Sequence, residues 1–222
     1  MKAFATLLAL LPICVLGATV NIHKRDLEGQ KLLGFRVVNE QLAVKYSQNG
    51  NKLLFDPTFQ SSSSDQLGPG VYLSPDPYGW IASDTTLGVG HWRCAVFANE
   101  AQWLRVKVAW IPREWGPDPP PGSTQQCDVG NCWYPVGTAS QNAGLTPANT
   151  VLLSAALGGN GPTLQMLIPN LVANDASLNI ETRCFNVVNQ NGMRNLESYG
   201  TADWNNPYPF GLAQPPTDIL RP

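Results

Sequence analysis

Short clusters of apolar residues recur along the chain, and most have the length of a β-strand rather than of a long helix. Clusters of this kind, rich in β-branched and other large apolar side chains and separated by Gly, Pro, Asn or Ser, are typical of strands. They occupy residues 33–38, 71–74, 92–98, 151–154, 164–168 and 177–185. The segment 102–111 fits a helix and a strand equally well, so its type stays open.

One segment has the pattern of a helix. Over residues 40–48, the side chains of Leu42, Ala43 and Tyr46 fall on one side of a helix. Asn39 precedes them and can cap the first turn, because its side-chain oxygen can accept a hydrogen bond from a backbone N–H that has no partner within the helix. We therefore predict a helix over 40–48.

The longest apolar run stands at the N-terminus. Met1-Lys2 precedes an apolar stretch over residues 3–16, and the small residues Gly17-Ala18 follow it. A basic start, an apolar run of this length and small residues at its exit are typical of a secretory signal peptide, whereas the run is too short to span a bilayer comfortably. We predict a signal peptide over 1–18 and a secreted, extracellular protein.

A dibasic pair, Lys24-Arg25, follows the signal peptide and matches the processing sites of eukaryotic secretory pathways. Cleavage there would define residues 19–25 as a propeptide. The remaining residues 26–222 fit one globular domain, because no internal repeat or shift in composition divides them. Within this domain we expect a Pro-rich insertion over 112–126 and an irregular tail over 200–222 that wraps the domain or is partly free.

Composition and charge narrow the class of protein. Charged residues make up 14% of a chain with 20 Gly and 19 Pro, which favours a loop-rich, strand-containing domain over a helical bundle. The chain has 14 basic and 16 acidic residues, and cleavage after Arg25 removes Lys2, Lys24 and Arg25 and leaves 11 basic against 16 acidic. No basic run follows residue 25 and no later stretch is apolar enough for a membrane span. We therefore expect neither generic nucleic-acid binding nor a transmembrane segment.

Four cysteines remain after the signal peptide is removed: Cys94, Cys127, Cys132 and Cys184. An even number in a secreted chain predicts two disulfides, for which three pairings exist. We favour Cys127–Cys132, which closes a short loop, together with Cys94–Cys184, which ties two strand-like segments. A zinc site is the alternative, but its ligand spacing is poor and His91 is the sole histidine of the mature chain, so we expect no metal.

Three segments with candidate chemistry follow one another in a telling order. They are Gly34-Phe35-Arg36-Val37-Val38, then a serine-rich stretch leading to Leu67-Gly68-Pro69-Gly70-Val71-Tyr72-Leu73-Ser74, and finally Leu164-Gln165-Met166-Leu167-Ile168-Pro169. This order resembles the ADP-ribosyltransferase superfamily of secreted toxins and related enzymes, over residues 33–185. The resemblance implies a single α+β domain of two packed antiparallel sheets with flanking helices, stapled here by disulfides.

The resemblance also implies a role for each matched residue. Arg36 would contact the pyrophosphate or ribose of NAD, because a guanidinium offers a rigid fork of donors. The serine-containing position of the family falls near Ser61, Ser62 and Ser63. Gly70 and Tyr72 would line the nicotinamide pocket, where a glycine permits close approach and an aromatic ring can stack. Without the resemblance, Arg36 reads as a strand arginine paired with an acid and Gly70 as part of a turn before a core strand.

Gln165 stands where the family has its catalytic glutamate. An amide carries no negative charge to oppose an oxocarbenium-like transition state, and it is no general base. Three interpretations therefore stay open: the enzyme is weak, another acid such as Glu181 or Glu197 substitutes, or the scaffold is kept without the reaction.

We therefore expect a secreted effector-like or toxin-like protein on an ADP-ribosyltransferase-like scaffold, monomeric and with catalysis disfavoured. Its partner would be a host or target-cell protein of another organism, and NAD is the cofactor that the scaffold would take. One alternative is an active NAD-dependent mono-ADP-ribosyltransferase. Another is an extracellular module that binds polysaccharide or protein, because seven Trp in a chain of this length can supply exposed binding surface.

Overall fold

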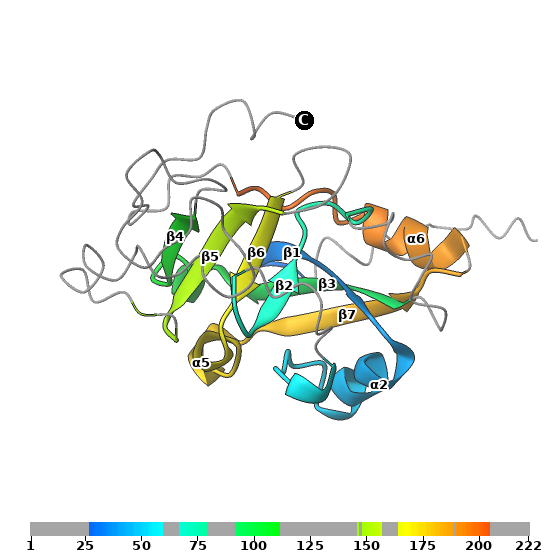
Figure 1. The fold of residues 1–222 in the computed structure, drawn as a ribbon. Helices are drawn as coiled ribbons and strands as arrows, with labels where there is room; N and C mark the ends of the chain where they lie inside the picture. Colours follow the sequence, from blue (N-terminus) through cyan, green and yellow to red (C-terminus); the bar gives the residue numbers. More distant parts are fainter. Residues whose placement is uncertain are drawn as a thin grey trace, which may run out of the picture.

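The structure is a computed structural model that describes residues 27–59, 67–79, 92–111, 146, 148–156, 164–188 and 190–204 (Figure 1). In chain order, the described elements are β1 (Gln30–Val38), α2 (Glu40–Gln48), the 3-10 helix η1 (Pro57–Phe59), β2 (Val71–Leu73), β3 (Trp92–Asn99), α3 (Glu100–Trp103), β4 (Lys107–Ile111), β5 (Thr150–Ala155), β6 (Leu164–Ile168), α5 (Asn170–Ala173), the 3-10 helix η3 (Ala176–Leu178), β7 (Glu181–Asn186) and α6 (Gln190–Glu197). The domain is therefore α+β, as predicted.

The described strands form two sheets. One has the order β1-β3-β7 and is antiparallel, and the other has the order β2-β6-β5-β4. The prediction of two antiparallel sheets is wrong for the second, because β4 and β5 run parallel, so this sheet is mixed. A parallel pair needs a crossover connection of a dozen residues or more, and the chain between β4 and β5 is long enough to supply one.

The two sheets meet at Phe35 of β1 and Ser74, the residue after β2. The backbone N–H of each residue donates to the carbonyl of the other, with both N···O distances 2.8 Å. Gly34 makes this approach possible, because a Cβ at this position would lie 2.6 Å from the carbonyl oxygen of Ser74. No side chain fits that space without moving the backbone, so a glycine is required where the sheets join.

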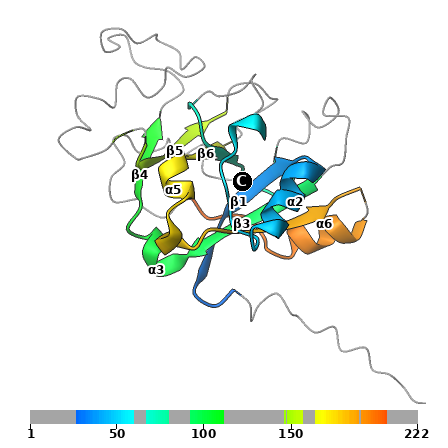
Figure 2. The same ribbon diagram turned by 90° about the horizontal axis from the view of Figure 1, so that it is seen from below.

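The main core lies between the sheets and continues under α2. It includes Leu33 and Val96 from the first sheet, Val71 and Met166 from the second, and Tyr46 from α2. A smaller cluster, built on Phe35, Ala95, Phe97 and Leu196, joins the other face of the three-stranded sheet to α6. Seen from below, α2 and α6 lie by the three-stranded sheet, whereas α3 and α5 lie by β4 (Figure 2).

The described part of the predicted tail, residues 200–204, packs on the domain. Trp204 is 5% exposed, and its indole Nε1 donates to the carbonyl of Leu33 at 2.8 Å. The backbone N–H of Ala202 donates a hydrogen bond to the carbonyl oxygen of Pro75 at 2.8 Å. These described residues therefore pack on the domain, and the prediction for the tail as a whole stays a prediction.

Most predicted elements are confirmed, and the exceptions have local causes. The helix over 40–48 forms as predicted, and the Asn39 side chain accepts a hydrogen bond from the N–H of Leu42 at 2.9 Å. The ambiguous segment 102–111 contains both the end of α3 and the whole of β4. The strand predicted over 177–185 begins only at Glu181, because η3 and a left-handed residue at Asn179 (φ 47°) precede it.

Some predictions fall on residues that the structure does not describe. These are the signal peptide over 1–18, the propeptide over 19–25, the Pro-rich insertion over 112–126 and the tail after residue 204. Within the described residues, no helix is long and apolar enough to cross a bilayer.

Candidate functional site

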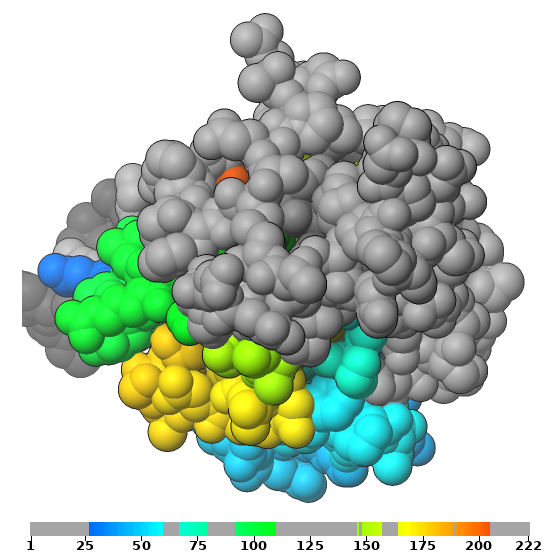
Figure 3. Space-filling view, turned by 60° about the vertical axis from the view of Figure 1, so that its left-hand side comes forward, coloured from blue at the N-terminus to red at the C-terminus, as the bar shows by residue number. Residues whose placement is uncertain are grey.

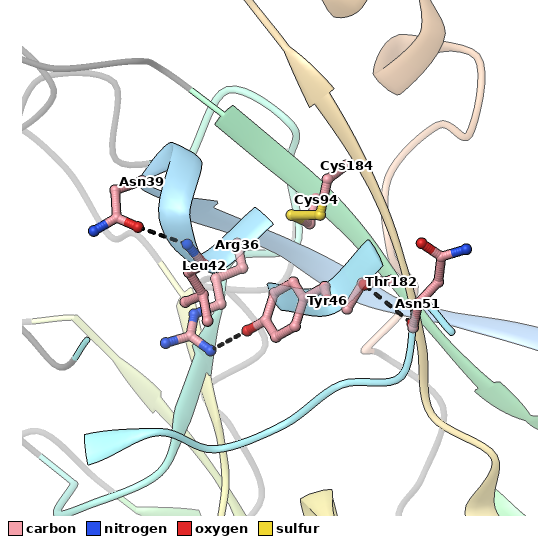
Figure 4. Close-up of a disulfide and its surroundings, with 8 residues drawn as sticks. All are labelled: Arg36, Asn39, Leu42, Tyr46, Asn51, Cys94, Thr182 and Cys184. Atoms are coloured by element: carbon pink, nitrogen blue, oxygen red, sulfur yellow. Dashed lines mark hydrogen bonds between the residues drawn. A yellow bond between two sulfur atoms is a disulfide. The ribbon is translucent and has the colours of Figure 1, made fainter. Parts of the chain in front are cut away.

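A row of three residues crosses the three-stranded sheet at the predicted site. Arg36 of β1 lies directly opposite Cys94 of β3, which lies directly opposite Cys184 of β7. The two cysteines form a disulfide, so this predicted pairing is confirmed. The covalent bond therefore fixes β7 to β3 at the level of Arg36 (Figure 4).

The side chain of Arg36 is held by α2. Its Nη1 donates a hydrogen bond to the hydroxyl oxygen of Tyr46 at 2.7 Å (Figure 4). Tyr46 is fully buried among the core residues of α2. Burial raises the pKa of the Tyr46 hydroxyl above its ordinary value and outweighs the opposing effect of the Arg36 charge. The hydroxyl therefore stays neutral at physiological pH, and it orients Arg36 without cancelling its charge.

Arg36 keeps most of its binding capacity. It is half-buried, and the two ion pairs among the described residues join Lys45 to Asp56 and Lys52 to Glu181. Within the described part of the chain, the Tyr46 hydroxyl is the one hydrogen-bond partner of the Arg36 side chain. A guanidinium has five N–H donors. Arg36 is thus a half-buried cation that no described carboxylate neutralises.

Gly70 and Tyr72 have clear structural roles. A Cβ on Gly70 would lie 2.5 Å from Leu167 Cδ1 and 2.6 Å from the carbonyl oxygen of Ile168, so only a glycine lets the chain enter β2 so close to β6. The Tyr72 hydroxyl accepts from the N–H of Leu67 and donates to the carbonyl of Gly68, both at 2.9 Å. These contacts support the interpretation of this segment as a turn before a core strand.

Gln165 lies in β6, where it is 4% exposed and directly opposite Ser154 of β5. Tyr72 pairs with Leu167, two residues further along β6. Side chains two residues apart on a strand share a face, so Tyr72 and Gln165 project from the same face of the four-stranded sheet.

Arg36 does not share that face. It projects on the same side of its sheet as its partner Cys94, which belongs to the main core together with Tyr46. Met166, which alternates with Gln165 along β6, contacts that core, so Gln165 points to the opposite face of its own sheet. The structure thus brings Tyr72 and Gln165 to one face and orients Arg36 toward α2 and the core.

The acids considered as substitutes for Gln165 are used or exposed elsewhere. Glu181 accepts hydrogen bonds from Lys52 Nζ at 2.8 Å and from Gln30 Nε2 at 3.1 Å. Partial burial alone would raise the pKa of Glu181, but these hydrogen bonds outweigh it, so the pKa lies below its ordinary value. Glu181 therefore carries a charge that ties the start of β7 to β1, and Glu197 is exposed at the end of α6.

Other predicted site residues lie outside the described part of the chain, namely Ser61, Ser62, Ser63, His91, Cys127 and Cys132. Their predicted roles, including the second disulfide, stay predictions. Within the described residues, no group of three His, Cys, Asp or Glu side chains is placed to hold a metal ion.

A cavity of about 420 Å³ lies away from the predicted residues. Its lining comes from α3 and the start of β4, from Asn149, and from α5 and η3, and none of Arg36, Gly70, Tyr72 and Gln165 takes part. Sequence reasoning missed this cavity, because three distant segments form it. It also missed Tyr46 as the partner of Arg36, since the pattern assigned Tyr46 to the core and carried no signal for the pairing.

Comparison with known proteins adds a family but no activity. No curated protein matches the sequence. A family of unknown function, DUF5910, matches residues 65–211, which is more than half of the chain and includes Tyr72, both bonded cysteines and Gln165, but not Arg36. The chain therefore belongs to the DUF5910 family of unknown function.

Proposed function

We propose that this chain is a secreted effector-like protein on an ADP-ribosyltransferase-like scaffold, acting on the cells of another organism by binding rather than by catalysis. The leader pattern of residues 1–25 supports secretion. Two joined sheets and a disulfide beside the arginine strand are compatible with the scaffold.

The observation that supports the proposal best is that the charge of Arg36 is oriented but not paired with a described carboxylate. Tyr46 orients its half-buried guanidinium, and no described carboxylate pairs with it. A positive charge held in this way favours an anion, and the planar fork of donors fits two oxygens of a phosphate group. We therefore assign to Arg36 the binding of a phosphate-bearing ligand, with the pyrophosphate of NAD as the first candidate.

Catalysis is disfavoured by the position and chemistry of Gln165. Its amide is neutral, its side chain is buried, and it projects from the opposite side to the core that Arg36 faces. A positioned carboxylate near the ribose is the group that would stabilise the transition state in which nicotinamide departs. The protein would therefore bind the dinucleotide without an efficient route to cleave it.

Two of the described tryptophans, Trp103 and Trp204, do not favour the alternative of a Trp-rich binding module. Trp103 and Trp204 are 2% and 5% exposed and belong to the main core. Both therefore stabilise the fold and offer no ring surface to a ligand.

Calorimetric titration of the mature protein with NAD and with inorganic pyrophosphate tests this function. We expect binding by the wild type, and a loss of about tenfold or more in Arg36→Gln, because hydrogen bonds to charged groups are worth ~1.5–3 kcal/mol each. Tyr46→Phe keeps the ring in the core and removes the orienting hydroxyl, so we expect a smaller loss.

Arg194→Gln is the matched control, because Arg194 is an exposed arginine in the last turn of α6. This variant removes the same charge and should bind as the wild type does. Thermal unfolding of each variant checks that the fold persists. Unchanged binding in Arg36→Gln, or no binding of either ligand by the wild type, would show that Arg36 is an ordinary structural arginine.

A further inference from the structure

Three side chains with reactive groups meet where the chain after α2 joins the start of β7. Lys52 lies opposite Glu181 in an isolated antiparallel bridge, and Asn179 precedes Glu181 by two residues. Figure 3 shows blue and cyan residues of the α2–η1 part of the chain beneath gold residues of the α5–η3 part on one face of the molecule. The cluster therefore joins distant segments, since Lys52 and Asn179 are 127 residues apart in sequence.

Backbone hydrogen bonds on both sides of Lys52 fix this junction. The N–H of Leu53 donates to the carbonyl oxygen of Ile180 at 3.0 Å, and the N–H of Thr182 donates to the carbonyl oxygen of Asn51 at 2.7 Å. Leu53 and Ile180 are both buried in the main core. The reactive side chains therefore start from backbone segments that stay together, and groups held in this way react far more readily than the same groups free in solution.

Each of the three side chains is hydrogen-bonded to the other two. Lys52 Nζ donates to Asn179 Oδ1, and it also donates to Glu181 Oε1 at 2.8 Å. The same Oε1 accepts from Asn179 Nδ2 at 3.1 Å. Gln30 Nε2 donates to the other carboxylate oxygen, Oε2, at 3.1 Å, and so holds the carboxylate in place. One oxygen of Glu181 therefore contacts both the nitrogen that can attack the Asn179 amide and the nitrogen that would leave it.

We propose that Lys52 and Asn179 form an intramolecular amide bond, with Glu181 as the group that moves the protons. The carboxylate takes one proton from the Lys52 ammonium, and the freed lone pair of Nζ attacks Asn179 Cγ. As the bond between Cγ and Nδ2 breaks, that proton and a second one from Nζ pass through Glu181 to the departing nitrogen. One ammonium group and one primary amide thus become one secondary amide and one ammonium ion, and no further reactant is needed.

The surroundings of Glu181 determine how fast this bond forms. Partial burial alone would raise the pKa of Glu181, but its hydrogen bonds, first that from Lys52, outweigh burial and hold the pKa below its ordinary value. Glu181 is thus a weak base towards an ammonium group, so we expect the bond to form over hours or days. The side chains of Lys52 and Glu181 are 42% and 27% exposed, so the released ammonium ion can leave to solvent and the reaction does not reverse.

Mass spectrometry of the mature protein, with its disulfides reduced, tests the proposal. After incubation of the folded protein, we expect the intact chain to be lighter by one ammonia than its sequence requires. Proteolysis should then release a branched peptide in which Lys52 is joined to Asn179. The branched peptide distinguishes this bond from a loss of ammonia within a single segment, such as Asn49-Gly50.

Three variants each remove one part of the chemistry. Glu181→Gln keeps the shape of the side chain but removes the base, so the branched peptide should form about 100-fold more slowly. Lys52→Arg keeps a cation opposite Glu181 but offers no amine to attack with. Asn179→Gly removes the amide at a position whose left-handed backbone (φ 47°) suits glycine. The last two variants should form no branched peptide, and thermal unfolding checks that all three fold.

Lys45→Arg is the matched control, because Lys45 Nζ pairs with Asp56 at 2.7 Å and contacts no amide side chain within the described residues. This variant should form the branched peptide as the wild type does, and so should Arg36→Gln. The proposal is overturned if the folded wild type, after a week at physiological pH and temperature, yields Lys52 and Asn179 only in separate peptides. It is also overturned if Glu181→Gln forms the bond as fast as the wild type. The proposal goes beyond phosphate binding at Arg36, and a failure of dinucleotide binding there would leave these outcomes untouched.

Discussion

The junction of the two sheets makes Gly34→Ala the most informative substitution for stability. The new methyl group would lie 2.6 Å from the carbonyl oxygen of Ser74, 3.1 Å from Leu73 Cβ and 3.3 Å from Trp204 Cζ2. The nearest atom belongs to the backbone, so no side-chain rotation can relieve the contact. The strand β1 must move away from β2.

That movement breaks the two hydrogen bonds between Phe35 and Ser74. Each is worth ~0.5–1.5 kcal/mol, and an alanine at the positive φ of Gly34 adds about 1–2 kcal/mol of strain. We therefore expect Gly34→Ala to lower the free energy of unfolding by about 2–5 kcal/mol, a large fraction of the ~5–15 kcal/mol that stabilises a typical domain.

Urea unfolding followed by tryptophan fluorescence measures this loss, and Gly50→Ala is the matched control. Gly50 also has a positive φ of 65°, but an added Cβ there would meet nothing within 4 Å. It should therefore lose only the strain of about 1–2 kcal/mol. If Gly34→Ala loses no more than Gly50→Ala, the close approach of the sheets does not require a glycine, and the reasoning is wrong.

Two further predictions concern carboxyl groups. The pKa of Asp56 is lowered from 3.8 to about 2, first by the hydrogen bond from Lys45 and then by those from Thr58. The stabilising effect of the charged Asp56 is therefore complete above pH 3.8 and is lost as the pH falls through about 2. In urea unfolding, the free energy of unfolding of Asp56→Asn should therefore depend less on pH over that range than that of the wild type. An unchanged pH dependence would contradict this. Gln165→Glu places a carboxylate at a position that is 4% exposed. This substitution should lower the free energy of unfolding by about 1–3 kcal/mol at pH 7 and by less at acidic pH. It should bring no gain in the release of nicotinamide from NAD. A clear gain would instead support the alternative of a transferase that lacks only its glutamate.

Local patterns predicted the parts of the fold that local physics determines. Asn39 signalled the start of α2, because its cap depends only on the next few residues. Cys94 and Cys184 could be paired because each lies within a strand-like segment. The helix α6 escaped prediction, because its sequence is mostly polar and carries Gly192, and only Gly192 and Leu196 are buried.

The features that pattern reasoning could not supply depend on contacts between distant segments. The parallel pairing of β4 with β5 is a choice of partner, which neither strand's sequence records. Gln165 and Met166 are consecutive in β6, so their side chains project from opposite faces of the sheet. Only the packing of the two sheets reveals that Met166 faces the same core as Tyr46. The order of motifs along the chain therefore carries only the proposed scaffold, whereas the side on which each motif's side chain projects required the three-dimensional structure.

The hydrogen bond between Trp204 and Leu33 has a consequence for the order in which the chain folds, and so for the proposed secretion. It joins residues 171 positions apart and closes the core around the first strand. During synthesis, β1 is made early, whereas Trp204, which covers it, is made only after most of the chain. Contacts of such long range form slowly. The nascent polypeptide therefore stays incompletely folded while residues 33–204 are being made, and an incompletely folded chain is what the proposed secretion through a translocation channel would need.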